Sequence, residues 1–175
     1  MTRGLRNCNP LNIRRVAGTK WKGQSSFQSD KAFVQFESLE YGLRAAFVLL
    51  RTYSIKYKAN CIQDIIRRWA PPSENDTERY IKNLCLWTGF GGLQRLTEED
   101  WPKLIRAMAR QECGAVLSED VILKGFRLFK KMKNEKLKTT MKNKTLETVV
   151  KIIVAALTAF LTALTTTSCC GFGPF

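Results

Sequence analysis

The sequence contains no histidine, and this absence excludes most catalytic arrangements that are built around an imidazole. Ser-His-Asp and Cys-His catalysis in their usual forms are excluded, and so are most zinc sites. The glycine-rich turn TGFGGL at residues 88–93 lacks the Lys-Ser/Thr ending of a phosphate-binding loop. We therefore expect no metal and no cofactor, and carboxylates remain as the obvious acid and base groups.

Other features are scarce as well. The six cysteines show no C-x-x-C spacing, and we interpret the four at Cys8, Cys61, Cys85 and Cys113 as small thiols rather than disulfides. The polar N-terminus, MTRGLRNCNP, is unlike a signal peptide, so no N-terminal export signal is expected.

Acidic residues are outnumbered by basic ones, 15 to 29, which gives a net charge of +14. Residues 130–151 hold eight of the lysines and only two glutamates. Such a chain should be drawn to polyanions: nucleic acid, anionic lipid or an anionic cell wall. Charge alone does not choose among them.

Hydrophobic periodicity predicts a mostly helical (α+β) domain. Residues 1–37 are rich in Gly, Asn and Ser and favour loops, with a short β-hairpin around Ala32 to Phe36. Helices are then expected after Ser38, after Asn60 up to the Pro71-Pro72 pair, after Thr77, from Thr97 or Asp100 to Gly114, and after Ser118.

The chain changes character after this domain. Residues 130–144 are lysine-rich without a convincing apolar face, which favours a linker. Residues 152–167, IIVAALTAFLTALTTT, carry no charge and favour a short membrane segment, with its preceding lysines on the cytoplasmic side. The alternative is a buried hydrophobic helix.

Glu112 is the carboxylate with the most informative position. On a helix over residues 101–114 it falls between Leu104 and Ile105, inside the apolar stripe. Desolvation and the negative end of the helix dipole both favour the protonated form of such a side chain, as a general acid requires. A Glu that curls to solvent or pairs with an arginine is the alternative.

A second carboxylate is less clear from the sequence. Glu37, Glu40, Glu74 and Asp76 are candidates, although Glu40 suits the first turn of a helix. The stretch SENDT at residues 73–77 either lines a polar cleft or caps the helix behind it.

Five phrases carry a resemblance to a known family. RGLRNCNPLNIRR, WKGQ, FVQFESLEYGLRA, RTY and RRWAPPSENDTERYI, within residues 3–114, resemble phage and prophage virion structural or lytic proteins. These phrases are in turn similar to parts of the lysozyme superfamily, especially lytic transglycosylases and bacterial glucosaminidases. The resemblance implies a lysozyme-like fold that acts on peptidoglycan.

The same resemblance assigns residues. By position, FVQF makes Gln35 a cleft residue, and NDTERYIKNL makes Tyr80 one. Under the enzyme hypothesis, and apart from the resemblance, Asn75 would also position glycan, and Trp69 nearby is either a sugar-stacking or a core aromatic. Those enzymes place the catalytic Glu before these motifs, whereas here ARQECG at residues 109–114 follows them, so a circular permutation would reconcile the order.

The resemblance completes the expected domain organisation. We expect a lysozyme-like domain at 1–133, a basic linker at 134–148, a hydrophobic membrane-directed helix at 149–168 and a tail at 169–175. From Met141 the chain resembles a short hydrophobic protein found beside cell-wall amidases in Bacteroides-type genomes, and TTSC at Cys169 resembles a lipobox.

Three functions follow as hypotheses. The first is a lytic transglycosylase or hydrolase that cleaves the MurNAc-GlcNAc backbone with Glu112 as general acid and base, in a phage-derived, membrane-associated or cell-envelope protein. The second is a non-catalytic virion or wall-binding module. The third is a nucleic-acid-binding protein, which is disfavoured because the arginines are scattered and no recognition motif is present. The expected partners are peptidoglycan and an anionic membrane surface.

Overall fold

Six helices make up the regular structure of residues 1–167, the part of the chain that this computed structural model describes, with side chains described through residue 155. The chain divides into two units, Met1–Lys131 and Met132–Phe175. The helices are α1 (Arg3–Arg6), α2 (Leu39–Tyr57), α3 (Ile62–Trp69), α4 (Thr77–Thr88), α5 (Trp101–Cys113) and α6 (Glu119–Thr167).

The helix starts and stops follow local chemistry. Helix α2 begins directly after Ser38 and α5 directly after Asp100, as predicted. Gly114 ends α5 with a φ of 67°, a left-handed conformation that glycine adopts without strain. The predicted cap of α4 was wrong by one residue, because the carboxylate of Asp76 accepts the hydrogen bond from the backbone N–H of Arg79. The Thr77 hydroxyl instead donates to the carbonyl oxygen of Ala70.

An aromatic cluster holds the first unit together. Phe47 of α2 lies 4.9 Å from Phe126 and 5.9 Å from Phe129, ring centre to ring centre, and Trp101 of α5 lies 5.9 Å from Phe129. Phe47 and Phe129 are fully buried, and burial of side chains this large supplies much of the stability of a small domain. The start of α6 is therefore part of this core.

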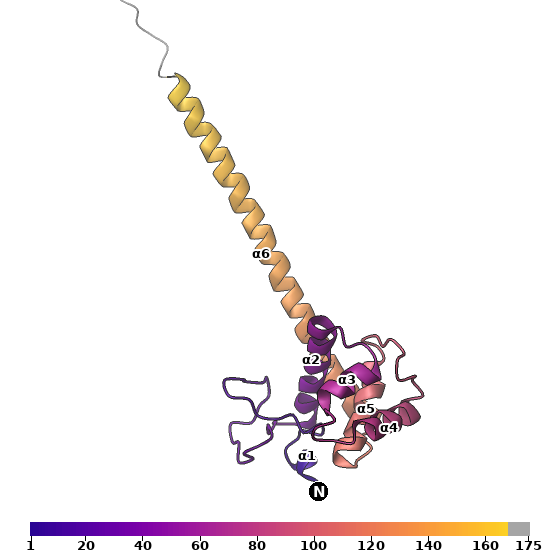
Figure 1. Cartoon of the computed structure of the whole chain (residues 1–175). Coiled ribbons are helices and arrows are strands. Elements are labelled where there is room, and N and C mark those ends of the chain that lie inside the picture. Colours follow the sequence, from indigo (N-terminus) through magenta and orange to yellow (C-terminus); the bar gives the residue numbers. More distant parts are fainter. Residues whose placement is uncertain (168–175) are drawn as a thin grey trace, which may run out of the picture. The chain divides into compact units, whose positions relative to one another are not determined.

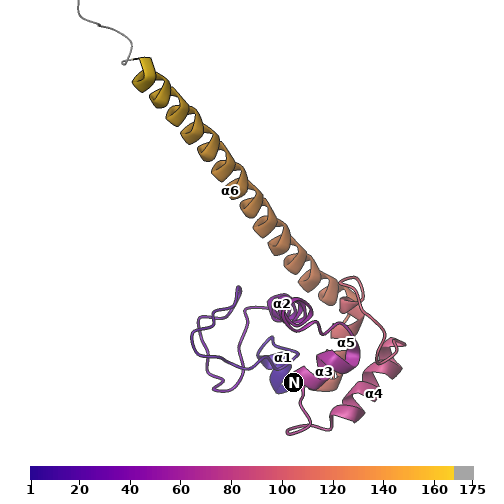
Figure 2. The same ribbon diagram turned by 45° about the horizontal axis from the view of Figure 1, so that its top comes forward.

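The segment between α1 and α2 is a long loop on one side of α2, whereas α3, α4 and α5 lie on its other side (Figures 1 and 2). The predicted hairpin at residues 32–36 was wrong: within residues 1–167 there is no strand. Phe33 and Phe36 instead form isolated antiparallel bridges with Arg14 and Gln24, respectively. The partners are separate turns of the loop, so no two-stranded hairpin results.

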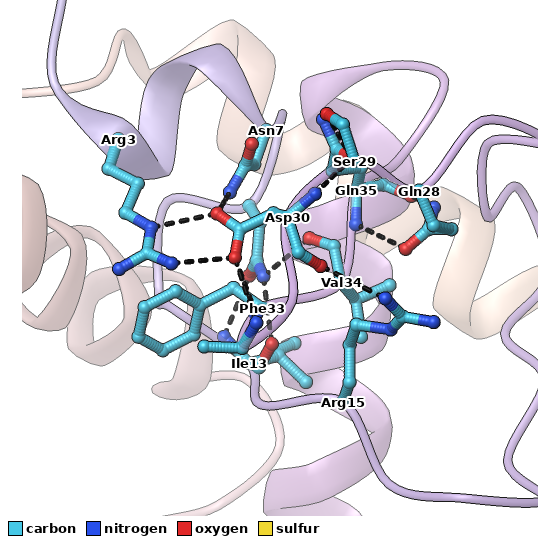
Figure 3. Close-up of polar contacts among 12 residues, drawn as sticks. Arg3, Asn7, Ile13, Arg15, Gln28, Ser29, Asp30, Phe33, Val34 and Gln35 are labelled. Atoms are coloured by element: carbon cyan, nitrogen blue, oxygen red, sulfur yellow. Dashed lines mark hydrogen bonds and ion pairs between the residues drawn. The ribbon is translucent and has the colours of Figure 1, made fainter.

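Polar contacts fix this loop. The side-chain amide of Asn9, which is 0% exposed, donates to the carbonyl oxygens of Ile13 (3.0 Å) and Val34 (2.8 Å), and its oxygen accepts from the N–H of Ile13 (2.9 Å). The Asp30 carboxylate receives two hydrogen bonds from the Arg3 guanidinium, both 2.7 Å, and one from Asn7 (Figure 3). Arg3 therefore holds the pKa of Asp30 well below its usual range, with Asn7 contributing next.

Helix α6 continues to the end of the described chain. Residues 134–148, expected as a linker, are helical within α6. A helix also forms over the apolar run at 149–167, but among the described residues no helix is long and apolar enough to span a membrane, so the membrane-spanning segment is not supported. Ser168, the tail at 169–175 and the lipobox-like Cys169 lie outside the described residues. The four cysteines predicted as thiols are free, which confirms that prediction.

Candidate functional site

Glu112 lies in the last turn of α5, half-buried, where three other segments of the first unit meet. Its Oε1 atom accepts hydrogen bonds from the Trp69 indole N–H and the Tyr80 hydroxyl, both at 3.0 Å. Trp69 is the last residue of α3 and Tyr80 belongs to α4. The structure thus brings together three of the residues that the sequence analysis assigned to the site.

The third of these segments, the loop between α1 and α2, supplies Asn12, which the sequence analysis did not assign. The Asn12 amide donates to Glu112 Oε2 at 3.2 Å and to the Glu112 backbone carbonyl at 3.4 Å. Its φ of 49° is left-handed, a conformation that Asn tolerates better than most residues. The phrase NPLNIRR contained the signal, because an asparagine between two apolar residues in a loop is suited to such a turn.

Tyr80 holds Glu112 from inside the domain. The residue is 5% exposed, and burial raises the pKa of its phenol well above the usual range, with the charge and hydrogen bond of Glu112 raising it further. Tyr80 therefore stays a neutral hydrogen-bond donor over the physiological pH range.

A cavity of about 710 Å³ opens beside the carboxylate. Asn12 and Trp21 of the N-terminal loop, Tyr53 of α2 and Trp69 of α3 line it, together with Asn75 and Glu112. Its size falls within the range of pockets that hold organic ligands. Aromatic rings with a few polar groups and two carboxylates, Glu74 and Glu112, are a lining suited to carbohydrate.

Two predicted binding residues have different outcomes. Asn75 lines the cavity, and its amide donates to the carbonyl of Pro71 at 3.4 Å. Gln35 does not line it. Its side-chain oxygen accepts from the Ser29 hydroxyl (3.1 Å) and the Asp30 N–H (3.0 Å), so the structure places Gln35 in the loop network instead (Figure 3).

Only one of the four candidate second carboxylates lines the cavity. This is Glu74, whose carboxylate pairs with the Arg14 guanidinium at 2.9 Å, and both side chains are exposed. Asp76 caps α4, and Glu37 is an exposed residue outside the cavity lining. Glu40 lies in the first turn of α2, where a hydrogen bond from the Ser38 side chain lowers its pKa.

The site holds no metal-binding arrangement in the described part of the chain. No group of three or more Cys, Asp or Glu side chains gathers there in a way that could hold an ion. The residues around Glu112 are donors and aromatic rings, which suit an organic polar ligand better than a cation.

Comparison with known proteins gives a relationship to a phage protein. No family model matches the chain. The chain is 43% identical to Protein P5 of Pseudoalteromonas phage PM2 over 127 residues, which cover 71% of this chain and 79% of the phage protein. The chain belongs to the Protein P5 family. The prediction of a phage-type protein is therefore confirmed, and the Protein P5 relationship extends over most of the length of both chains.

Proposed function

We propose that this Protein P5 relative cleaves the MurNAc-GlcNAc backbone of peptidoglycan, with Glu112 as the general acid and base. The observation that carries the proposal is the position of this one carboxylate at a cavity of about 710 Å³, held by Asn12, Trp69 and Tyr80. A carboxylate fixed beside an aromatic-lined cavity is what protonation of a glycosidic oxygen requires.

The hydrogen bonds indicate which oxygen would carry the proton. Oε1 already receives two hydrogen bonds, from Trp69 and Tyr80, whereas Oε2 receives one from the Asn12 side chain. As general acid, Glu112 would therefore act through Oε2. After it protonates the leaving oxygen, the same atom becomes the base that helps a sugar hydroxyl, or a water, to attack.

A transglycosylase fits better than a two-carboxylate hydrolase. Glu74 is the other carboxylate among the residues that line the cavity, and it is engaged with Arg14. A retaining or inverting hydrolase needs a second carboxylate free to act on the opposite face of the sugar. Intramolecular attack by the substrate's own hydroxyl removes this requirement.

The lysozyme-like fold and its circular permutation belong to the same proposal. Helix α1 packs against α5, and the Asn12–Glu112 contact joins the two ends of the segment that carries the resemblance. Contact between the ends of a compact domain is what a permuted order requires.

The test is the release of soluble fragments from purified peptidoglycan by the full chain, with the products analysed by mass spectrometry. Glu112→Gln should reduce release about 10²- to 10⁴-fold, the usual contribution of a general acid. Glu37→Gln is the matched control, since this exposed residue lies outside the cavity lining. Anhydro-sugar ends would identify a transglycosylase and reducing ends a hydrolase, whereas no release by folded wild-type protein would refute the proposal.

A glycan-binding module without turnover is the second candidate. The observation that favours it is that the Glu112 carboxylate already receives three hydrogen bonds from its own protein. In that case the wild type and Glu112→Gln would bind peptidoglycan equally and release nothing.

We also propose that the second unit, with the exposed lysines of α6, binds an anionic membrane surface in the cell envelope. Lys136, Lys138, Lys142, Lys144 and Lys151 are all exposed. Each lysine near an anionic bilayer contributes roughly 1 kcal/mol. Sedimentation of the full chain with phosphatidylglycerol vesicles, but not with neutral phosphatidylcholine vesicles, would support this partner; equal binding to both would contradict it.

A further inference from the structure

A second hollow, distinct from the Glu112 cavity, lies where α2 ends and α3 begins. Its volume is about 520 Å³, and it is lined by Tyr57, Ala59, Asp64, Arg67 and Arg68. Two guanidinium groups and one carboxylate in this lining favour a charged ligand over an apolar one.

Arg68 is held in place without a carboxylate. Its guanidinium carbon lies 3.7 Å above the centre of the Tyr57 ring, and in the described part of the chain no acidic side chain lies within ion-pair distance of it. Stacking engages the flat face of a guanidinium and leaves its N–H edge for partners in the plane. Arg68 is therefore fixed in orientation while its edge remains available to a ligand.

The other two charged residues of the hollow have partners. Arg67 pairs with Glu78 at 3.2 Å. Asp64, the one acidic side chain of the lining, lies in the first turn of α3 and interacts with the Cys61 thiol. The Cys61 thiol is neutral, so Asp64 keeps its negative charge, and Arg68 is the basic residue of the lining that has no acidic partner within ion-pair distance among the described residues.

A row of aromatic rings connects this hollow with the Glu112 cavity. Tyr57 lies 6.2 Å from Tyr53, and Tyr53 lies 6.4 Å from Trp69, ring centre to ring centre. Tyr53 and Trp69 line the cavity, and Trp69 donates to Glu112. Tyr57 of the second hollow is therefore linked through Tyr53 to Trp69 of the Glu112 cavity, which brings the two linings into proximity.

We propose that this second hollow is an outer subsite of the same groove, in which Arg68 binds a carboxylate carried by the peptide-substituted glycan. The proposal rests on the proposed function, since the glycan must reach the Glu112 cavity. Arg68 would then be a specificity residue that distinguishes acidic muropeptides from uncharged sugar chains. A planar guanidinium with a free edge can hold a carboxylate through two parallel hydrogen bonds.

The experiment measures binding by calorimetry with the full chain. The probes are a soluble disaccharide-peptide oligomer with free carboxylates and the same oligomer with its carboxylates amidated. Wild type should bind the acidic probe more tightly, and Arg68→Gln should weaken only this binding, by about tenfold, the size expected for loss of a charge-assisted pair. Arg95→Gln, at an exposed arginine outside the hollow, is the control for net charge and should change neither affinity.

Two further measurements keep the result interpretable. Arg68→Lys keeps the charge but not the planar edge, so it should recover only part of the lost affinity, and the thermal unfolding of each variant shows whether it is folded. An equal loss on both probes, or no difference between Arg68→Gln and Arg95→Gln, would overturn the proposal. So would a dependence on Arg68 that is seen only with a glycerol phosphate oligomer, because the ligand would then be a phosphate.

Failure of this inference is distinguishable from failure of the proposed function. Binding of the two probes requires no turnover, whereas the proposed function is tested by the release of fragments. A chain that discriminates the probes through Arg68 but releases nothing would keep the outer subsite and lose the enzyme.

Discussion

Replacement of Asn9 by Ala should destabilise the first unit substantially. The Asn9 side chain is fully buried and makes three hydrogen bonds, to both backbone groups of Ile13 and to the carbonyl of Val34. A buried hydrogen bond contributes about 1 kcal/mol net, and its loss also leaves backbone groups without a partner. The expected decrease in the free energy of unfolding is therefore about 3 kcal/mol.

The assay is denaturant unfolding followed by circular dichroism, with the slope against denaturant checked for constancy. For a chain of this size the loss corresponds to a fall in Tm of roughly 10 °C. Asn75→Ala is the matched control, because Asn75 is exposed and makes one long hydrogen bond of 3.4 Å, so its loss should stay within about 0.5 kcal/mol. If the two variants lose the same stability, the reasoning about Asn9 is refuted.

Three further predictions concern packing, acid stability and ionisation. Gly42→Ala should cost about 2 kcal/mol or more, because a Cβ there would overlap the carbonyl oxygen of Cys8, and thermal unfolding will measure it. Asp30→Asn should reduce the decrease in the free energy of unfolding that the wild type shows between about pH 5 and pH 2. The pKa of Asp30 is lowered in the folded state, so its ionised carboxylate stabilises the fold above the unfolded-state pKa of about 3.9, and this stabilisation is lost as the pH falls. Tyr80→Phe should leave the rise in near-ultraviolet absorbance around pH 10 unchanged, since the pKa of the Tyr80 phenol lies well above that value.

Each of these predictions has an outcome that contradicts it. Gly91→Ala should change the free energy of unfolding little, because a Cβ there meets only ordinary contacts. If both glycine variants lose the same stability, overlap with the Cys8 carbonyl oxygen is not the reason for the effect at Gly42. Arg3→Gln should reduce the loss of stability at acid pH as Asp30→Asn does, because Arg3 is the main cause of the lowered pKa of Asp30. If either variant loses stability at acid pH as steeply as the wild type, the Arg3–Asp30 pair is not the cause of that loss. If the absorbance rise near pH 10 in Tyr80→Phe is smaller than in the wild type by the amplitude of one tyrosine, the Tyr80 phenol ionises in the usual range and the prediction is wrong.

The sequence predicted the parts of the fold that are set by short-range patterns. The periodic apolar residues of α2 and α5 and the glycine at the end of α5 gave helices in the right places. The place of Glu112 on α5 was predicted in the same way, because it follows from spacing alone. Residues 134–148 were expected as a linker because they lack an apolar face; the segment is helical, as its lysines allow, and its role as a linker stays a prediction.

The parts that failed depend on contacts between distant segments. Phe33 and Phe36 form bridges with Arg14 and Gln24 instead of belonging to a local hairpin, and no local sequence pattern reveals these partners. Gln35 was assigned by resemblance to the cleft, whereas Asp30 and its neighbours take up its side chain. Pairing of loop residues is decided by tertiary context, which overrides local propensity.

The contact between Asn12 and Glu112 bears on the order of folding. The two residues are 100 positions apart, so their meeting requires closure of nearly the whole first unit. Helices form from local contacts, whereas a pairing over such a separation bears a large chain-entropy cost and forms slowly. We therefore expect the carboxylate to acquire its amide partner late, after the helices have formed, and a nascent chain whose residue 112 is still inside the ribosome lacks this contact altogether.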